Sequence, residues 1–156
     1  FNYKCEDFDL VFINDYRTGM FDKKFIDSVN NIECKKIVLA SQLSSNKTNL
    51  SNFSNYKTLI LNDYEFENEF NIKLEYENLY SNLFKNNLEQ IIVTLGKNGA
   101  LSLTKKGNKH FVTKSKNFTN TIGAGDIFVG SYLVFEDIDL ANQHTFNFLE
   151  ECNERL

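Results

Sequence analysis

A glycine-rich segment at residues 120–130, N-T-I-G-A-G-D-I-F-V-G, holds the residue types best suited to chemistry. Gly123 and Gly125 let the backbone turn tightly and approach a ligand without a clash with a Cβ atom. The apolar run after this turn predicts a helix, and the N–H groups at a helix start bind anions. Asp126 follows these amides, although its carboxylate would repel a bound anion. Its position is explained if it takes a proton from a nucleophile that attacks the anion. The alternative is a structural turn with an acidic residue in the first helical turn.

Gly-Ala-Gly-Asp followed by an apolar helix resembles the signature of the PfkB (ribokinase-like) carbohydrate kinases. The resemblance implies that the amides of Gly123, Ala124 and Gly125 stabilise charge on the transferring phosphoryl group. It also implies that Asp126 is the base that deprotonates a sugar hydroxyl. Where the family motif usually begins with Asp, this chain has Asn120. The change removes a charge there and leaves the glycine turn and the base in place.

A second pattern, Asn62-x-x-Glu65, follows an apolar run at residues 58–61. Read structurally, it is a helix N-cap with a glutamate three residues later. It also matches the N-x-x-E motif of the PfkB family. By resemblance, Asn62 positions the phosphates and Glu65 holds a network of magnesium-bound water, as suits a cation that keeps several waters. Both interpretations are compatible. Together with Glu67 and Glu69, Glu65 predicts a solvated acidic helix face.

The segment V-T-L-G-K-N-G at residues 93–99 resembles the family's V-T-x-G-x-x-G motif, which lines the nucleotide phosphates and ribose. The resemblance implies that Thr94, Gly96 and Gly99 contact the nucleotide, together with Thr121 of the glycine-rich segment. A strand followed by a glycine turn is the plain structural alternative. The three motifs occur in the order of the family, and that shared context favours the kinase interpretation. The cofactors implied are ATP and Mg²⁺.

The loop N-D-Y-R-T-G at residues 14–19 and the pair Ser41-Gln42 are similar to segments of the heptose-phosphate kinases within this family. The similarity implies that Asp15 and Gln42 contact the substrate. Thr18 stands where that branch usually has a lysine, which removes a charge that could meet a substrate phosphate. Ordinary polar loops at strand ends are the alternative for both segments.

Composition narrows the function classes. The 156 residues are 42% hydrophobic and 24% charged, as in ordinary soluble domains, and the net charge of −4 offers no basic surface for nucleic acid or an anionic membrane. No apolar run is long enough to span a bilayer, and no signal peptide is recognisable. Three scattered cysteines, Cys5, Cys34 and Cys152, argue against a disulfide framework or zinc site and suit the cytoplasm.

Apolar periodicity predicts an α/β fold with a mainly parallel sheet. Polar loops at Asn14, Ser41, Asn62 and Gly96 follow strands, and we expect them to face one crevice at the carboxyl ends of these strands. Asp22 is expected to cap the first helix, and Phe146, Leu149 and Cys152 to face inward from the last one. The predicted strands are residues 8–13, 36–40, 58–61 and 90–95, followed by a β-hairpin formed by residues 100–104 and 110–113. The predicted helices begin near residues 22, 62, 75, 127 and 140. The helix that begins at residue 75 is expected to run to residue 87.

The resemblance implies a ribokinase-like three-layer sandwich with a small β-hairpin, truncated relative to the full family fold. Residues 1–156 would be a single portion of that domain, on the nucleotide side. The expected function is ATP-dependent phosphoryl transfer to a sugar or sugar-phosphate hydroxyl, with a missing N-terminal half or a second copy of the chain as the partner. A catalytically incomplete nucleotide-binding or interaction module is the alternative. A dinucleotide-binding Rossmann domain is disfavoured because no G-x-G-x-x-G follows the first strand.

Overall fold

The structure, a computed structural model, describes residues 8–16, 19–41, 50–114 and 116–154. Its strands are β1 (Leu10–Asp15), β2 (Lys36–Ser41), β3 (Thr58–Asn62), β4 (Gln90–Thr94), β5 (Ala100–Thr104) and β6 (Gly107–Phe111). Its helices are α1 (Lys23–Asn30), α2 (Asp63–Phe70), α3 (Ala124–Phe135) and α4 (Ile138–Glu154), with 3₁₀ turns η2 (Leu50–Asn52), η3 (Ser81–Leu83) and η4 (Gly96–Asn98). Within these ranges no helix combines the length and the apolar character needed to cross a membrane.

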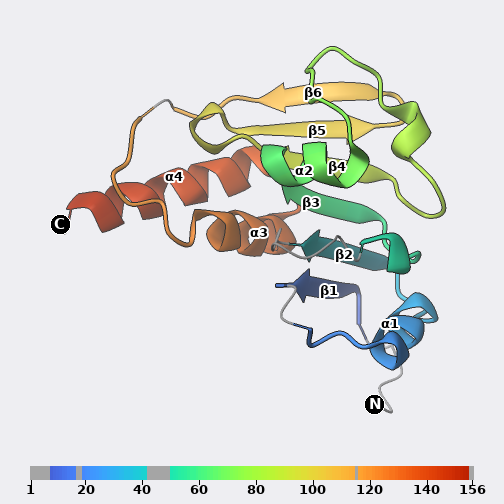
Figure 1. The fold of residues 1–156 in the computed structure, drawn as a ribbon. Helices are drawn as coiled ribbons and strands as arrows, with labels where there is room; N and C mark the ends of the chain where they lie inside the picture. The colour runs from blue at the N-terminus through green and yellow to red at the C-terminus, as the bar shows by residue number, and fades with distance from the viewer. Residues whose placement is uncertain (1–7, 17–18, 42–49, 115, 155–156) are drawn as a thin grey trace.

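The strands form one sheet in the order β1-β2-β3-β4-β5-β6 (Figure 1). Neighbours from β1 to β4 run parallel, and β5 and β6 continue the sheet as an antiparallel hairpin. Asp15 pairs with Ser41, and Asn62 pairs with Thr94, so the parallel strands end at the same edge of the sheet. The predicted mainly parallel α/β sheet with a hairpin is confirmed.

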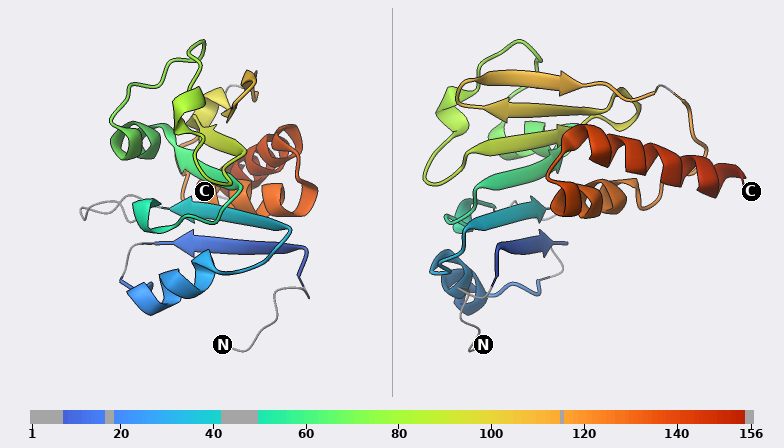
Figure 2. Two further views of the ribbon diagram at one scale, coloured as in Figure 1. Left: turned by 90° about the vertical axis from the view of Figure 1, so that its right-hand side faces the viewer. Right: turned by 180° about the vertical axis from the view of Figure 1, so that it is seen from behind.

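Helices cover both faces of the sheet (Figure 2). The segments that connect the parallel strands, including α1 and α2, pack on one face, and α3 and α4 pack together on the other. Right-handed crossovers that add strands in one direction all lie on the same face, which explains this separation. The three-layer arrangement implied by the family resemblance is confirmed.

Each face of the sheet has its own apolar cluster, because successive side chains of a strand point to opposite faces. Leu39 and Leu59 pack toward α1 and α2, whereas Val38, Ile60 and Ile92 pack toward α3 and α4. Full burial of such a side chain contributes roughly 1.5–3 kcal/mol. Burial on both faces also explains why these strands are continuous apolar runs in the sequence.

The predicted helix starts are largely confirmed. The Asp22 carboxylate caps α1 by accepting a hydrogen bond from the Phe25 N–H at 2.8 Å, a contact whose loss typically costs about 1 kcal/mol. The last helix begins at Ile138, and Leu149 faces inward from it with 8% exposure. Phe146 and Cys152 on the same helix are half-buried.

The helix predicted over residues 75–87 is wrong. That region is a chain of turns around the short η3 segment, and Leu79 within it is 67% exposed. The buried hydroxyl of Tyr80 accepts a hydrogen bond from the Glu75 N–H at 2.7 Å and lies 3.1–3.2 Å from the carbonyl oxygens of Lys73 and Glu75. These bonds tie the backbone to a side chain where a helix would bond to itself.

Candidate active site

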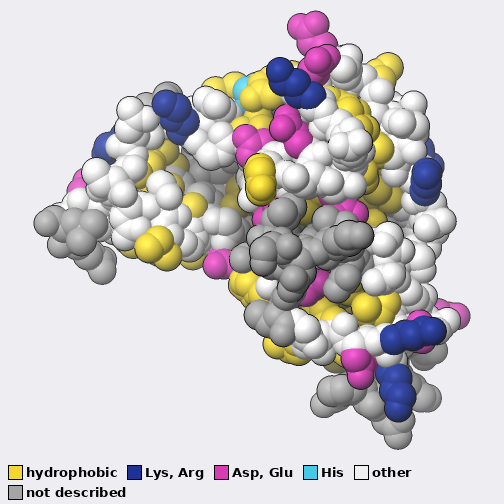
Figure 3. Space-filling view, viewed as in Figure 1, with side chains coloured by type: hydrophobic (Ala, Val, Ile, Leu, Met, Phe, Trp, Pro, Cys, Tyr) yellow, Lys and Arg dark blue, Asp and Glu magenta, His cyan; other side chains and the backbone are white. Residues whose placement is uncertain are grey.

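A cleft of about 740 Å³ opens at the carboxyl ends of the parallel strands. α3 begins beyond the arrowheads of β1 to β3 (Figure 1), and in the space-filling view the segment before α3 and the end of α4 form a projecting lobe (Figure 3). The predicted phosphoryl- and nucleotide-contacting residues that line the cleft are Asn62, Glu65, Thr94, Gly96, Gly99, Thr121, Ala124, Gly125 and Asp126. Asn14 also lines it, so the strand-end positions at Asn14, Asn62 and Gly96 share one crevice, as expected.

The turn before α3 presents backbone amides at this cleft. Gly123 caps the helix in the left-handed region at φ 82°, a conformation that favours glycine. The Ala124 N–H donates to the Thr121 carbonyl oxygen at 3.2 Å. The first turn of a helix leaves its remaining N–H groups without an intrahelical acceptor. The amides of Gly125 and Asp126 are therefore available to an anion in the cleft that both residues line.

Asn153 of α4 fixes the segment that leads into this turn. Its Oδ1 accepts hydrogen bonds from the backbone N–H groups of Thr119 and Asn120, both at 3.0 Å, and from the Thr119 hydroxyl at 2.7 Å. Its Nδ2 donates to the Asn120 carbonyl oxygen at 2.9 Å. The Asn120 side chain accepts from the Ile122 N–H at 3.0 Å, a local turn that Asp closes equally well. The replacement of the family's Asp by Asn120 therefore keeps this turn.

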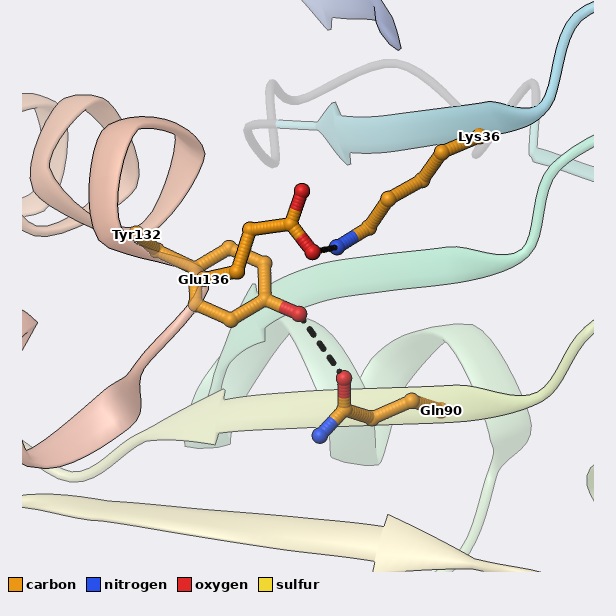
Figure 4. Close-up of polar contacts among 4 residues, drawn as sticks. All are labelled: Lys36, Gln90, Tyr132 and Glu136. Atoms are coloured by element: carbon orange, nitrogen blue, oxygen red, sulfur yellow. Dashed lines mark hydrogen bonds and ion pairs between the residues drawn. The ribbon is translucent and has the colours of Figure 1, made fainter. Parts of the chain in front are cut away.

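The other end of α3 is held on the sheet (Figure 4). The Tyr132 hydroxyl donates to Gln90 Oε1 of β4 at 2.9 Å, and Gln90 Nε2 donates to the Ser102 hydroxyl at 2.8 Å. Glu136, just after α3, forms an ion pair of 2.8 Å with Lys36 of β2. These contacts and the buried face of the helix fix the direction in which the first turn of α3 points.

Asp126 lies in that first turn, and its side chain is exposed. The hydroxyl of Tyr16, the residue after β1, donates a hydrogen bond to Asp126 Oδ1 at 2.8 Å. This hydrogen bond, followed by desolvation and the charge of Asp126, raises the pKa of Tyr16 above its usual 10.0; a hydrogen bond with the Asn14 side chain opposes the shift. Sequence reasoning singled out the loop that contains Tyr16 but not this contact, since nothing in the local pattern links residues 110 positions apart.

Asn62 and Glu65 form a complete capping box at the start of α2. The Glu65 N–H donates to Asn62 Oδ1 at 2.7 Å, and the Asn62 N–H donates to Glu65 Oε2 at 2.8 Å. Glu65 is only 8% exposed, so the expectation of a solvated acidic face is wrong for this residue. The capping box orients the Glu65 carboxylate at the wall of the cleft, and the structural and functional interpretations of Asn62-x-x-Glu65 remain compatible.

The donor set at α2 fits Mg²⁺ bound mainly through a nucleotide and water. Glu65 brings carboxylate oxygens to the cleft, and the exposed Asp63 lines it beside Glu65. Mg²⁺ prefers such hard oxygen donors and retains several waters. In the part of the chain that the structure describes, no group of three or more His, Cys, Asp and Glu is arranged to hold a metal.

The segment before α3 and helix α4 give the cleft an apolar wall with lysine side chains beside it. Phe118 and Phe146 meet edge to face with ring centroids 5.4 Å apart, and both line the cleft. Lys114 lies 5.9 Å from the Phe146 ring centre and Lys116 5.6 Å from that of Phe118. Aromatic walls with a few polar groups are typical of sites for planar ligands. Apart from the inward orientation expected of Phe146, no sequence motif marked this wall.

One predicted substrate residue, Asp15, does not line the cleft. Asp15 is 5% exposed and is not among the lining residues, whereas its neighbour Asn14 is. Because neighbouring strand residues point to opposite faces, the Asp15 side chain belongs to the α1 and α2 side. Gln42 lies outside the described residues. Gly123 shapes the turn without lining the cleft itself.

Residues 22–135 match the model of the family described as pfkB family carbohydrate kinase. The chain belongs to this family. It is 35% identical to a ribokinase of Dictyostelium discoideum in an alignment 127 positions long, which covers 67% of this chain and 40% of that protein. The family recognised from the glycine-rich segment is thus confirmed.

Solved structures of the same fold agree. A ribokinase from Thermotoga maritima superposes with a TM-score of 0.64 at 20% identity, over 83% of this chain and 43% of that one. An aminoimidazole riboside kinase from Salmonella enterica superposes with a TM-score of 0.63 at 17% identity, over 90% of this chain and 56% of that one. Phosphofructokinase-2 from Escherichia coli superposes with a TM-score of 0.57 at 19% identity, over 80% of this chain and 43% of that one. At these identities the likeness shows the ribokinase-like fold. The chain spans about half the length of these relatives.

Proposed function

We propose that the chain carries the nucleotide-binding and catalytic part of an ATP-dependent kinase that phosphorylates a hydroxyl of a sugar or sugar phosphate. The observation that carries this proposal is the convergence of three segments on one cleft. The helix start with Asp126, the capped carboxylate of Glu65 and the glycine turn after β4 are far apart in sequence and line the same space. Phosphoryl transfer needs mainly positioning and electrostatic stabilisation, which is what this arrangement offers.

In the proposed reaction, Asp126 accepts the proton of the acceptor hydroxyl. The acceptor oxygen forms a bond to the γ-phosphorus, and the bond between that phosphorus and the oxygen bridging to the β-phosphate breaks, so ADP leaves with the electron pair. The amides of Gly125 and Asp126 face the developing negative charge at the positive end of α3. The resemblance implied the amides of Gly123, Ala124 and Gly125. Because the Ala124 N–H already bonds to the Thr121 carbonyl oxygen, we propose that Gly123 and Ala124 contribute by forming the turn that exposes the amides of Gly125 and Asp126.

The nucleotide is proposed to lie along the side of the cleft formed by α2, the turn after β4 and the aromatic wall. Thr94, Gly96 and Gly99 would contact the phosphates and ribose, and Thr121 would approach the phosphates next to the helix start. Bound Mg²⁺ would neutralise phosphate charge, with Asn62 and Glu65 holding its water shell. The wall formed by Phe118 and Phe146 suits the adenine ring.

The acceptor is proposed to be a sugar or a sugar phosphate. The relatives are named as kinases of ribose, a riboside and fructose phosphate, which have a sugar hydroxyl in common. A heptose phosphate is the finer hypothesis. It comes from the similarity of the loop at residues 14–19 and of Ser41-Gln42 to segments of the heptose-phosphate kinases, with Gln42 as the proposed substrate contact that remains. We also propose that residues 1–156 act as one domain portion in the cytoplasm, completed by further chain or by a second copy. Nucleic acid is not an expected partner.

A catalytically incomplete nucleotide-binding or interaction module is the second candidate function. It is favoured by the share of the relatives that this chain spans, about half. The two candidates share the nucleotide site and differ in turnover.

The test is calorimetric titration of the chain and of Asp126→Asn with MgATP, followed by phosphoryl transfer assays with a panel of sugars and sugar phosphates. For a kinase we expect both proteins to bind MgATP and only the unmodified chain to turn over, with a rate loss of at least about 100-fold in the variant. Binding without turnover by either protein would favour the module. Undiminished turnover by Asp126→Asn would refute the base assignment.

A further inference from the structure

Tyr16 makes a contact with Asp126 that the reaction described above does not use. Its hydroxyl donates to Oδ1 of the carboxylate at 2.8 Å. Asp126 is otherwise exposed, and no second hydrogen bond to its carboxylate exists among the described residues. One oxygen of the proposed base is thus held by a phenol, and the other faces the cleft or solvent.

The two residues come from different parts of the fold. Tyr16 follows β1, at one edge of the sheet, whereas Asp126 belongs to α3, which packs on the face opposite α1. The proposed nucleotide contacts at Gly96 and Gly99 follow β4, three strands away from β1 in the sheet order. Tyr16 therefore approaches the carboxylate from the side away from the nucleotide.

We propose that Tyr16 is a positioning residue, which holds the Asp126 carboxylate through Oδ1 so that its second oxygen faces the acceptor hydroxyl. This inference rests on the proposed kinase function. A carboxylate on a short, exposed side chain has several accessible rotamers, and a general base must lie within hydrogen-bond reach of the proton it removes. During transfer Tyr16 keeps its own proton, and the acceptor's proton goes to the other oxygen of Asp126.

Electrostatics agree with this geometry. The bond to Asp126 is the main cause of the raised pKa of Tyr16, so the phenol stays protonated and remains a donor throughout the neutral range. The other titratable side chains that line the same cleft are Asp63, Tyr64, Glu65, Lys97, Lys114 and Lys116. None of these takes part in the hydrogen bond between Tyr16 and Asp126.

The experiment compares the unmodified chain with Tyr16→Phe, Asp126→Asn and Tyr76→Phe. The phenylalanine variants each remove one hydroxyl and keep the ring. Tyr76 is the matched control, because it is similarly exposed, at 42% against 46% for Tyr16, and packs against His110 at the hairpin edge of the sheet. Tyrosine ionisation is followed by ultraviolet absorbance or NMR, MgATP binding by calorimetry, and phosphoryl transfer by steady-state kinetics.

We expect Asp126→Asn to lower the pKa of Tyr16 toward its usual value, which would establish the bond in solution. Tyr16→Phe should lower kcat about tenfold, with the MgATP affinity and the KM for the acceptor nearly unchanged, because the base remains but is less well oriented. Tyr76→Phe should match the unmodified chain.

An ionisation of Tyr16 that is the same with and without the Asp126 carboxylate would overturn the proposal. So would an unchanged kcat in Tyr16→Phe, or a loss that appears only in KM. If the chain binds MgATP but does not turn over, the tyrosine titration alone decides. If the titration shows the bond but neither protein binds MgATP, the proposed kinase function fails while the link between β1 and α3 stands.

Discussion

Two glycines of the cleft, Gly99 and Gly125, should respond to alanine in opposite ways. Gly99 has φ 87° and ψ −131°, a backbone conformation that costs an L-residue about 1–3 kcal/mol. A Cβ atom there would overlap the carbonyl oxygen of Phe111 in β6 and lie 3.0 Å from the Thr113 nitrogen. Apart from its chain neighbours and the backbone of its own helix, no described atom lies within 4 Å of a Cβ added at Gly125, in the first turn of α3.

The overlap at Gly99 can be relieved only by moving β6, since the obstructing atoms are backbone. That movement weakens ladder bonds between β5 and β6 and the 3.2 Å bond from Asn142 Nδ2 to the Phe111 carbonyl oxygen, each worth about 0.5–1.5 kcal/mol. We therefore expect Gly99→Ala to lose about 3–6 kcal/mol, a large part of the roughly 5–15 kcal/mol that stabilises a typical domain.

Gly125→Ala should keep its stability or gain up to about 1 kcal/mol, because alanine is the better helix former. Its Cβ would stand beside the amides proposed to meet the phosphoryl group, so the affinity for MgATP should fall about tenfold or more, the effect of losing one charge-assisted hydrogen bond. Urea denaturation followed by circular dichroism measures the first quantity and calorimetry the second. An unchanged urea midpoint in Gly99→Ala, or full MgATP affinity in Gly125→Ala, would refute the reasoning.

Two further predictions concern other parts of the chain. Asn153→Ala should lose about 1–3 kcal/mol of stability and weaken MgATP binding, because the segment at Thr119 and Asn120 loses its bonds to α4; unchanged urea midpoint and affinity would contradict this. Burial, and secondarily the charge of Glu69, raise the pKa of Tyr56 above 10.0. Because the folded chain holds this proton more tightly than the unfolded one, the stability contribution is complete below pH 10.0 and is lost as the pH rises through the folded value. Tyr56→Phe should show a smaller loss of stability at alkaline pH, and equal losses in urea titrations of both proteins would contradict the assignment.

Local patterns were sufficient for the sheet and for the helix starts. The strands are continuous apolar runs, and the capping box at Asn62 and Glu65 is a short-range signal whose bonds join residues three apart. The same reasoning failed at residues 75–87, where apolar periodicity suggested a helix. There the hydroxyl of Tyr80 bonds to the backbone, and Asn86 adopts φ 53°, which ends helical geometry.

The contacts that hold the glycine turn and Asp126 could not be predicted from local sequence patterns. Asn153 lies 33 residues from Asn120, and Tyr16 lies 110 residues from Asp126. Asparagine and tyrosine are ordinary residues at these positions, and their roles follow only from the packing of α4 and β1 beside the start of α3. Local sequence patterns therefore point to the groups proposed to react but not to the residues that hold them in place.

The alternation of side chains between the two faces of the sheet decides which strand-end residues line this cleft. Asn14, Asn62 and Thr94 all line it, and each stands two residues after a side chain that packs toward α3 and α4. A shift of one residue in β1 would bring Asp15 into the cleft and turn Asn14 away. Because both faces of the strands are buried, the apolar runs do not reveal which residues point to which face. Tyr16 lies one residue beyond the last paired position of β1, so the strand does not dictate the direction of its side chain. It can therefore reach Asp126 from the edge strand, while Asp15 stays on the opposite face.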